Sequence, residues 1–173
     1  MNKLFTGLLI AAGVLCSALA QTVPSAEEMV KALVKPELPK AGPATRGLRN
    51  LNVEAVAAPA PKPALSLLIQ FDFDSARVKP ESQQLLANLS QALQSQELRE
   101  SKFAVEGHTD ARGAAEYNLR LSGQRAEAVR GFLKAHGVVE DRLVAAGKGS
   151  TELANSADPY AAENRRVRIV NLD

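Results

Sequence analysis

The sequence predicts an α+β domain with a mixed β-sheet that carries its helices on one face, preceded by a leader and a proline-rich stalk. From residue 65 onward, apolar runs typical of strands alternate with helical patterns in the order β-α-β-α-β-β. Hydrophobic residues make up 46% of the 173-residue chain, which supplies a core for one ordinary domain. The folded domain is therefore expected to span residues 65–173.

Apolar residues mark the first strand and the first helix of this domain. Residues 65–73 form an apolar run that predicts a strand. Pro80 is typical of the first turn of a helix. The apolar face of that helix is formed by Leu85, Leu86, Leu89 and Leu93.

The remaining elements continue the alternation of strands and helices. Residues 102–106 alternate in a way that predicts the second strand. A second helix is expected with Ser122 as its N-cap and Gly137 just past its end. Residues 143–146 and 166–172 predict the last two strands, with a loop or a short helix between them.

Residues 1–20 are predicted to be a secretory signal peptide. A positive start at Lys3 precedes an uncharged, mostly apolar stretch that ends in the small-x-small sequence ALA before Gln21. Two alternatives stay open, a retained membrane anchor and lipid attachment at Cys16. If the leader is removed, the mature chain has no cysteine and needs no disulfide.

Residues 21–64 are predicted to form a Pro/Ala-rich linker. Seven of the nine prolines lie there, at positions 24, 36, 39, 43, 59, 61 and 63, and the segment has no aromatic residue. Such a composition buries too little apolar surface to fold alone and favours a semi-rigid chain.

Within this linker, residues 26–35 predict a short amphipathic helix. Ser25 and Glu28 form a capping-box pattern, and apolar residues follow at helical spacing until Pro36. So short a helix is marginal in water, and we expect it to fray within a tether. The alternative is that residues 25–50 dock on an envelope protein partner or on the domain itself.

The charge balance of the chain excludes one class of function. Lys and Arg number 21 and Asp and Glu number 19, which leaves a net charge of +2. Aromatic residues make up only 4% of the chain. A nucleic-acid-binding domain needs a basic footprint, and a single-strand binder also needs aromatic side chains for stacking. No nucleic-acid partner is expected.

Asp110 and Arg125 form the strongest candidate binding pair. Asp110 follows the second predicted strand, and Arg125 is expected in the first turn of the helix capped by Ser122. A helix N-terminus adds free N–H groups and a partial positive charge. The arrangement suits a zwitterion, whose ammonium contacts Asp110 while its carboxylate takes a bidentate bond from Arg125. The alternative is that the two side chains pair with each other or with solvent.

The sequence around this pair resembles the OmpA-like C-terminal domain family. The run GHTDARGAAEYNLRLSGQRAEAVRGFLKAHGV carries the resemblance, and FDFDSARVKPES, GKGST and AENRRVRIV add to it. It covers residues 66–171 and does not extend to the outer-membrane barrel of the name-giving proteins, so no pore function is expected. The chain departs from the family at Leu153 and Ala154, where a proline is usual, and over residues 155–162.

The resemblance implies an OmpA-like fold that binds peptidoglycan non-covalently, through the diaminopimelate of the stem peptide, without a cofactor. It also implies a periplasmic protein associated with the cell wall or the outer membrane. The ligand-binding aspartate and arginine of the family match Asp110 and Arg125. The other matched positions expected at the ligand site are Thr109, Asn118, Leu121, Phe73, Asn164, Arg165 and Arg166.

Three other interpretations have less support from the residues. A metal site of His108 with Asp72, Asp74 or Asp110 would have no second histidine or cysteine at ligand spacing. The strand before Asp72 and Asp74 resembles the opening of haloacid-dehalogenase-type phosphatases, whose later motifs the chain lacks. A structural tether would use wall binding to hold a partner through residues 25–50. We therefore expect neither a metal nor an enzymatic activity.

Overall fold

The computed structural model describes residues 23–35 and 61–173. The predicted leader with Cys16 and the linker segment 36–60 lie outside the described residues. Within the described part of the chain, no helix combines the length and the apolar character that a membrane span requires.

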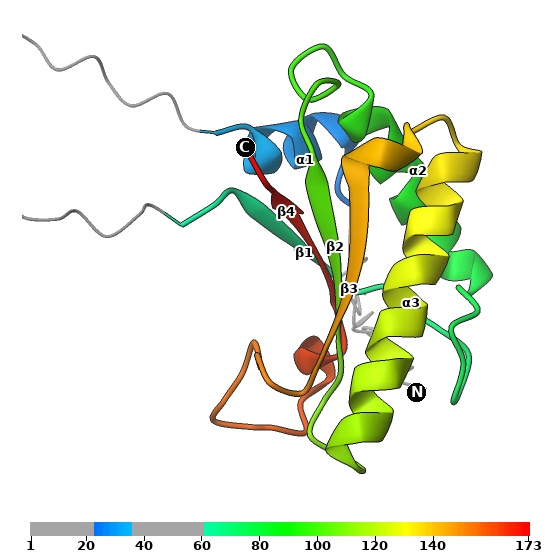
Figure 1. Cartoon of the computed structure of the whole chain (residues 1–173), viewed down its shortest axis with the longest axis vertical. Helices are drawn as coiled ribbons and strands as arrows, with labels where there is room; N and C mark the ends of the chain where they lie inside the picture. The colour runs from blue at the N-terminus through cyan, green and yellow to red at the C-terminus, as the bar shows by residue number, and fades with distance from the viewer. Residues whose placement is uncertain (1–22, 36–60) are drawn as a thin grey trace, which may run out of the picture.

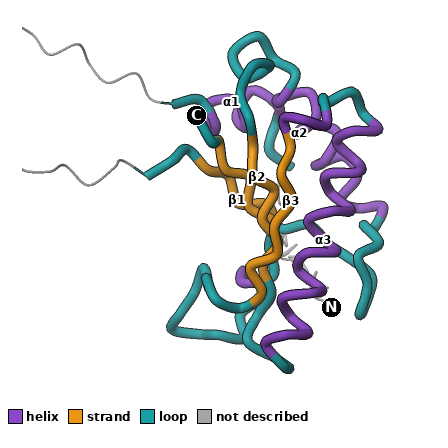
Figure 2. Tube along the Cα trace, viewed as in Figure 1, coloured by secondary structure: helices purple, strands orange, loops and turns teal. Residues whose placement is uncertain are grey.

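A four-stranded mixed sheet forms the centre of the described structure (Figure 1, Figure 2). Its spatial order is β1 (Ala64–Leu67), β4 (Val167–Asn171), β2 (Phe103–His108) and β3 (Leu143–Gly149). β4 pairs antiparallel with β1 and with β2, whereas β2 and β3 are parallel. A parallel pair needs a crossover, which here runs through the longest helix. The predicted α+β fold with a mixed sheet is confirmed.

Two helices cover one face of this sheet. α2 (Gln83–Leu93) follows a 3₁₀ turn that begins at Pro80, and α3 (Ala115–Ala135) runs alongside β3 in Figure 1. Successive side chains of a strand point to opposite faces of the sheet, so every second side chain of each strand is buried under these helices. The fully buried side chains of the core include Leu86, Leu89, Leu93, Phe103, Val105, Val129, Leu133 and Ile169. The predicted packing of the helices on one face is also confirmed.

The first helix, α1 (Ala26–Leu33), packs against α2 and β1. Its Met29 and Leu33 are fully buried in the same core. The predicted capping box is present: Ser25 Oγ accepts from Glu28 N at 3.3 Å, and Glu28 Oε2 accepts from Ser25 N at 2.8 Å. The expectation of a frayed helix is wrong, because burial in the core supplies the stability that eight residues lack alone.

Side-chain amides add two further connections between α1 and the domain. Asn171 Nδ2 donates to Leu33 O at 3.0 Å, and Asn88 Nδ2 donates to Pro24 O at 2.9 Å. These bonds hold both ends of α1, one to β4 and the other to α2. A piece of the predicted linker is therefore part of the folded unit.

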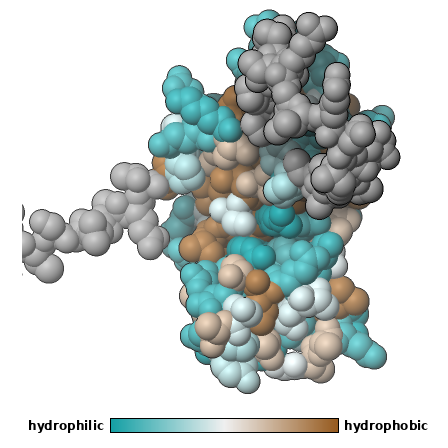
Figure 3. Space-filling model, turned by 90° about the vertical axis from the view of Figure 1, so that its left-hand side faces the viewer, coloured by the Kyte–Doolittle hydropathy of each residue, from teal (hydrophilic) through white to brown (hydrophobic). Residues whose placement is uncertain are grey.

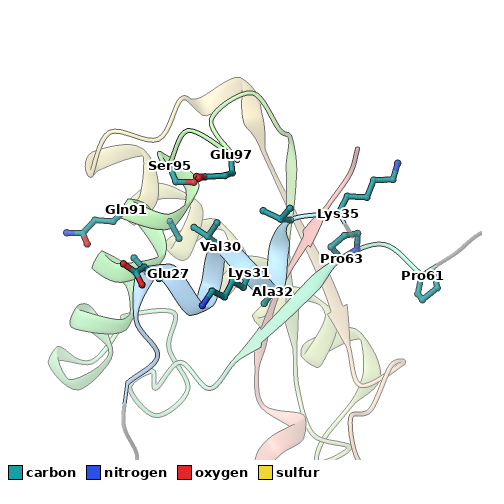
Figure 4. A pocket seen from close by; sticks show the side chains of 13 residues that line it. Glu27, Val30, Lys31, Ala32, Lys35, Pro61, Pro63, Gln91, Ser95 and Glu97 are labelled. Carbon is teal, nitrogen blue, oxygen red and sulfur yellow. The ribbon is translucent and has the colours of Figure 1, made fainter. Parts of the chain in front are cut away.

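The surface around α1 is mixed in character. A cleft of about 1000 Å³ opens beside the helix, and its lining includes Val30, Gln91 and Pro63 (Figure 4). On the side where β1 and β4 lie, hydrophilic and hydrophobic residues are interspersed over the described surface (Figure 3).

The first strand is shorter than the apolar run that predicted it. β1 ends at Leu67, and an isolated β-bridge then joins Phe71 to Val78. The turn inside this bridge contains Asp74, whose φ of 51° lies in the left-handed region. The apolar run is thus divided between β1 and the segment that leads into the turn.

α3 begins at Ala115, so the prediction of Ser122 as its N-cap is wrong. Ser122 is fully buried in the middle of the helix. Its hydroxyl donates to Leu119 O at 2.8 Å and accepts from Gly149 N at 2.9 Å, which connects α3 to the end of β3. The helix ends as predicted, because Gly137 adopts a φ of 95° just past it.

Two glycines let α3 lie directly on the backbone of β2 and β3. A Cβ atom on Gly107 would come within 2.1 Å of Ser122 O, and one on Gly147 would come within 2.6 Å of Leu119 O. Both neighbours are backbone atoms of α3, so relief of the overlap requires a shift of the helix. The lack of a side chain at these two positions sets the distance between helix and sheet.

Gly147→Ala is expected to lower the free energy of unfolding by about 1–3 kcal/mol or more, because the new Cβ overlaps the backbone of α3. Urea denaturation followed by circular dichroism measures this change. Gly131→Ala is the matched control, since nothing lies within 4 Å of a Cβ at that helical position. Alanine at position 131 is expected to stabilise the protein by up to about 1 kcal/mol. Equal stability of the two variants would contradict the close contact.

Leu33→Ala is expected to cost about 2–5 kcal/mol of stability, because it opens a cavity beneath α1. The exposed Lys31 of the same helix provides the control, and Lys31→Ala is expected to change stability by no more than about 0.5 kcal/mol. The midpoints of urea denaturation of the two variants measure this difference in stability. If the midpoints coincide, α1 adds nothing to the core.

Candidate functional site

A cleft of about 440 Å³ lies where the turn after β1, the loop after β2 and the first half of α3 meet. Arg165, just before β4, completes its wall. The cleft is lined by Phe71, Asp72, Phe73, Asp74, Thr109, Asp110, Arg112, Tyr117, Asn118, Leu121, Arg125 and Arg165.

Most of the site residues predicted from the sequence come together in this cleft. Those that line it are Phe73, Thr109, Asp110, Asn118, Leu121, Arg125 and Arg165. The remaining two, Asn164 and Arg166, lie outside it.

One face of α3 supplies three of the lining residues. Asn118, Leu121 and Arg125 are spaced by three and four positions, so their side chains lie on the same side of the helix. Arg125 reaches the cleft from within the helix and not from its first turn, which corrects the sequence expectation. The free N–H groups of the helix N-terminus lie near Ala115, so they do not stand beside the guanidinium of Arg125.

Asp110 is a buried carboxylate with two donors. Its Oδ1 accepts from Arg112 N at 3.1 Å, and its Oδ2 accepts from Arg165 Nη1 at 2.8 Å. The residue is only 7% exposed. Within the described residues, no ion pair joins Asp110 to Arg125, so the partner of Asp110 is Arg165.

Asn118 positions the loop that carries Asp110. Its Nδ2 donates to Arg112 O at 2.8 Å and more weakly to Asp110 O at 3.4 Å. Thr109 N donates to Gly149 O at 2.9 Å, which connects the same loop to the end of β3. The carboxylate of Asp110 is therefore held in place from both sides before any ligand arrives.

Arg125 is positioned by a backbone carbonyl and an aromatic ring. Its Nε donates to Ser75 O at 3.1 Å, and its guanidinium lies 4.9 Å from the centre of the Phe71 ring. Burial lowers the pKa of Arg125, and Arg165 lowers it further, whereas Asp110 raises it. The group nevertheless keeps its charge at neutral pH. Since only Nε has a hydrogen-bond partner among the described residues, the terminal N–H groups are available to a carboxylate.

Arg165 and its two neighbours in the sequence have different surroundings. Asn164 is fully buried and its Nδ2 donates to Asp158 O at 2.9 Å, so it holds the preceding loop together. Arg166 points away from the cleft, and its Nη2 donates to Glu152 O at 3.1 Å. Neither Asn164 nor Arg166 lines the cleft, so the cleft adds no support to the prediction that they belong to the ligand site.

Five lining residues were not among the site residues predicted from the sequence. They are Phe71, Asp72, Asp74, Arg112 and Tyr117. Tyr117 lies four positions before Leu121, so a helix that begins at Ala115 places it on the same face. The expected N-cap at Ser122 concealed this periodicity.

Comparison with known proteins gives a consistent match to one family. A model of the OmpA family matches residues 70–167. The chain is 39% identical over 101 residues to outer membrane protein A of Bordetella avium, covering 57% of this chain and 51% of that protein. It is 37% identical over 106 residues to the peptidoglycan-associated lipoprotein of Brucella melitensis, and the match covers 60% of this chain and 62% of that protein. The chain thus spans about half to three fifths of the length of these curated relatives.

A solved structure gives the same result. The peptidoglycan-associated lipoprotein from Burkholderia pseudomallei is similar, with 36% identity and a TM-score of 0.52, covering 61% of this chain and 88% of that chain. Every residue that lines the cleft falls within the family match, whereas α1 precedes it.

Proposed function

The chain belongs to the OmpA family, and on that premise we propose that its domain binds peptidoglycan non-covalently through the diaminopimelate of the stem peptide. The family is not an enzyme family, which agrees with the expectation of no enzymatic activity. Relatives named for their association with peptidoglycan, from Brucella and Burkholderia, support the wider part of the proposal. The finer part, recognition of diaminopimelate, rests on the charges in the cleft.

The observation that carries the proposal is the placement of Asp110 and Arg125 in the same cleft. The far end of diaminopimelate bears an ammonium and a carboxylate on one carbon atom. Asp110 supplies a buried acceptor for the ammonium, and the terminal N–H groups of Arg125 supply a bidentate donor for the carboxylate. A ligand that carried only one of these charges would engage only one of the two protein groups and would forgo the other contact.

Arg165 limits the affinity of this site. Its guanidinium already occupies one oxygen of Asp110 at 2.8 Å. The ligand ammonium must share the carboxylate with Arg165 or displace it, and either event costs part of the binding free energy. We therefore expect modest affinity for a single stem peptide, with rebinding among many identical peptides holding the protein on the cell wall.

The proposal places the protein in the periplasm, associated with the cell wall and the outer membrane. The curated relatives are an outer membrane protein and a peptidoglycan-associated lipoprotein. The signal peptide predicted at residues 1–20 agrees with this placement.

An envelope tether that holds a partner through residues 25–50 is the second candidate function. The cleft beside α1, which Val30 borders, favours it (Figure 4). Against it, Met29 and Leu33 are buried in the domain and offer no surface to a partner. Peptidoglycan binding therefore remains the proposed function.

Asp110→Ala and Arg125→Ala are each expected to weaken binding by about 2–4 kcal/mol, because each removes one partner of a desolvated charge pair. This corresponds to a loss of about 30-fold or more. Cosedimentation of the purified protein with insoluble sacculi measures it. Arg120→Ala is the matched control, since Arg120 is exposed on the same helix and does not line the cleft.

Soluble competitors separate the two parts of the proposal. Diaminopimelate is expected to release the wild-type protein, whereas pimelate, which lacks the ammonium groups, is expected to leave it bound. If wild-type protein stays in the supernatant, peptidoglycan binding is wrong. If it sediments but both variants sediment equally well, the ligand lies elsewhere on the domain. Circular dichroism of each variant checks that the fold is intact.

A further inference from the structure

The face of the sheet opposite α2 and α3 carries a cluster of charged side chains that the proposed function does not use. Glu106 and His108 project from β2 to this face, because they alternate with the buried Val105. Lys148 projects from β3, Arg168 from β4, and Glu152 from the loop after β3. Glu106 lies directly opposite Arg168 in the antiparallel pairing.

Three of these side chains converge closely enough to share one ion. Ligand atoms of Glu106, His108 and Glu152 all lie within 4.8 Å of one another. An imidazole nitrogen with two carboxylate oxygens is a donor set that suits Zn²⁺ and related divalent ions.

His108 is the observation that points to a ligand. The residue is 1% exposed, and neither ring nitrogen has a hydrogen-bond partner among the described residues. Burying polar atoms without a hydrogen-bond partner is unfavourable. Glu106 Oε2 is likewise buried without a hydrogen bond, and its nearest cation is Arg168 Nη1 at 3.5 Å. One ion bound between the ring and the carboxylate would satisfy a lone pair on each.

The protonation state of the ring agrees with this role. Burial is the main cause that lowers the pKa of His108 to about 4; the positive charges of Arg166, Arg168 and Lys148 act in the same direction and Glu152 opposes them. The ring is therefore neutral at pH 7, which is the form that ligates a metal ion.

Lys148 competes for the same position. Its Nζ lies 3.0 Å from Glu152 Oε1 and 3.5 Å from Glu106 Oε1, so the ammonium already bridges the two carboxylates. The Lys148 side chain is about one third exposed, and it can turn toward solvent when another cation arrives. The positive charges of Arg166 and Arg168 also oppose a cation here, which weakens the affinity.

We propose that Glu106, His108 and Glu152 form a site for a divalent transition-metal ion such as Zn²⁺, in competition with the ammonium of Lys148. The sequence expectation of no metal site considered His108 with Asp72, Asp74 and Asp110. In the structure those three aspartates line the ligand cleft, while Glu106 and Glu152 accompany His108 on the other side of the sheet.

Isothermal titration of the untagged, EDTA-treated full chain with ZnCl₂ tests the proposal. One Zn²⁺ per chain is expected to bind. Glu152→Gln and His108→Gln are each expected to weaken binding about tenfold or more, through loss of a ligand. Lys148→Met is expected to tighten it, because the competing ammonium is gone. If the cluster were only structural, Lys148→Met would not bind Zn²⁺ more tightly.

The control is His136→Gln, which removes the other histidine of the chain and is expected to leave Zn²⁺ binding unchanged. Asp110→Ala is expected to keep Zn²⁺ binding while losing peptidoglycan, so the two proposals fail independently. No heat with wild type, or equal binding by wild type, Glu152→Gln and Lys148→Met, would overturn the site. Because Glu152 and Lys148 are not buried, these two variants decide the outcome even if His108→Gln does not fold.

Discussion

The backbone of α3 lies directly against the backbone of β2 at Gly107 and of β3 at Gly147, and the geometry of the cleft depends on this contact. The strand β2 leads directly into the loop of Asp110, and α3 carries Arg125. The separation of these two charged groups is therefore fixed by the distance between helix and strand. A helix that stood even slightly further from the sheet would carry Arg125 away from Asp110 while leaving the secondary structure unchanged. The two glycines thus determine the geometry of the cleft without lining it.

Within the described residues of the cleft, Asp110 and Arg125 form no ion pair with each other, and each is held by other groups. Arg125 donates to a backbone carbonyl and lies over the Phe71 ring, and Asp110 is bound by Arg165 and a backbone amide. Asp110 and Arg125 are thus each stabilised by groups other than one another, which the proposed zwitterionic ligand requires. Holding the groups in place before binding reduces the ordering cost that a ligand must meet. The engagement of Asp110 by Arg165 acts in the opposite direction, and the modest affinity proposed for a single stem peptide rests on it.

The strands and the helices follow from the sequence, because hydrophobic periodicity is local. Asp110 and Arg125 were expected from their residue types, whereas the other cleft residues were expected only from the resemblance to the OmpA-like family. The features that sequence reasoning missed all depend on tertiary contacts. Ser122 has the residue type of an N-cap, but its hydroxyl bonds within α3 and to β3. Arg165 and Arg166 are adjacent and chemically equal, yet only Arg165 points to the cleft. The burial of Leu33 could not be inferred from the weak helix propensity of a short segment, because its stability comes from residues far along the chain.

The docking of α1 has a mechanical consequence. Because α1 packs against α2 and β1, the chain before Val23 joins the folded unit at this helix. A force applied to the chain before Val23 would act on the domain through α1. It would load the contacts of Met29 and Leu33 before any force reached the pairing of β1 with β4. Short peripheral elements open at a lower free energy than the core of a domain. Under tension α1 would unfold before the rest of the domain, while α3 and β2 kept the cleft intact.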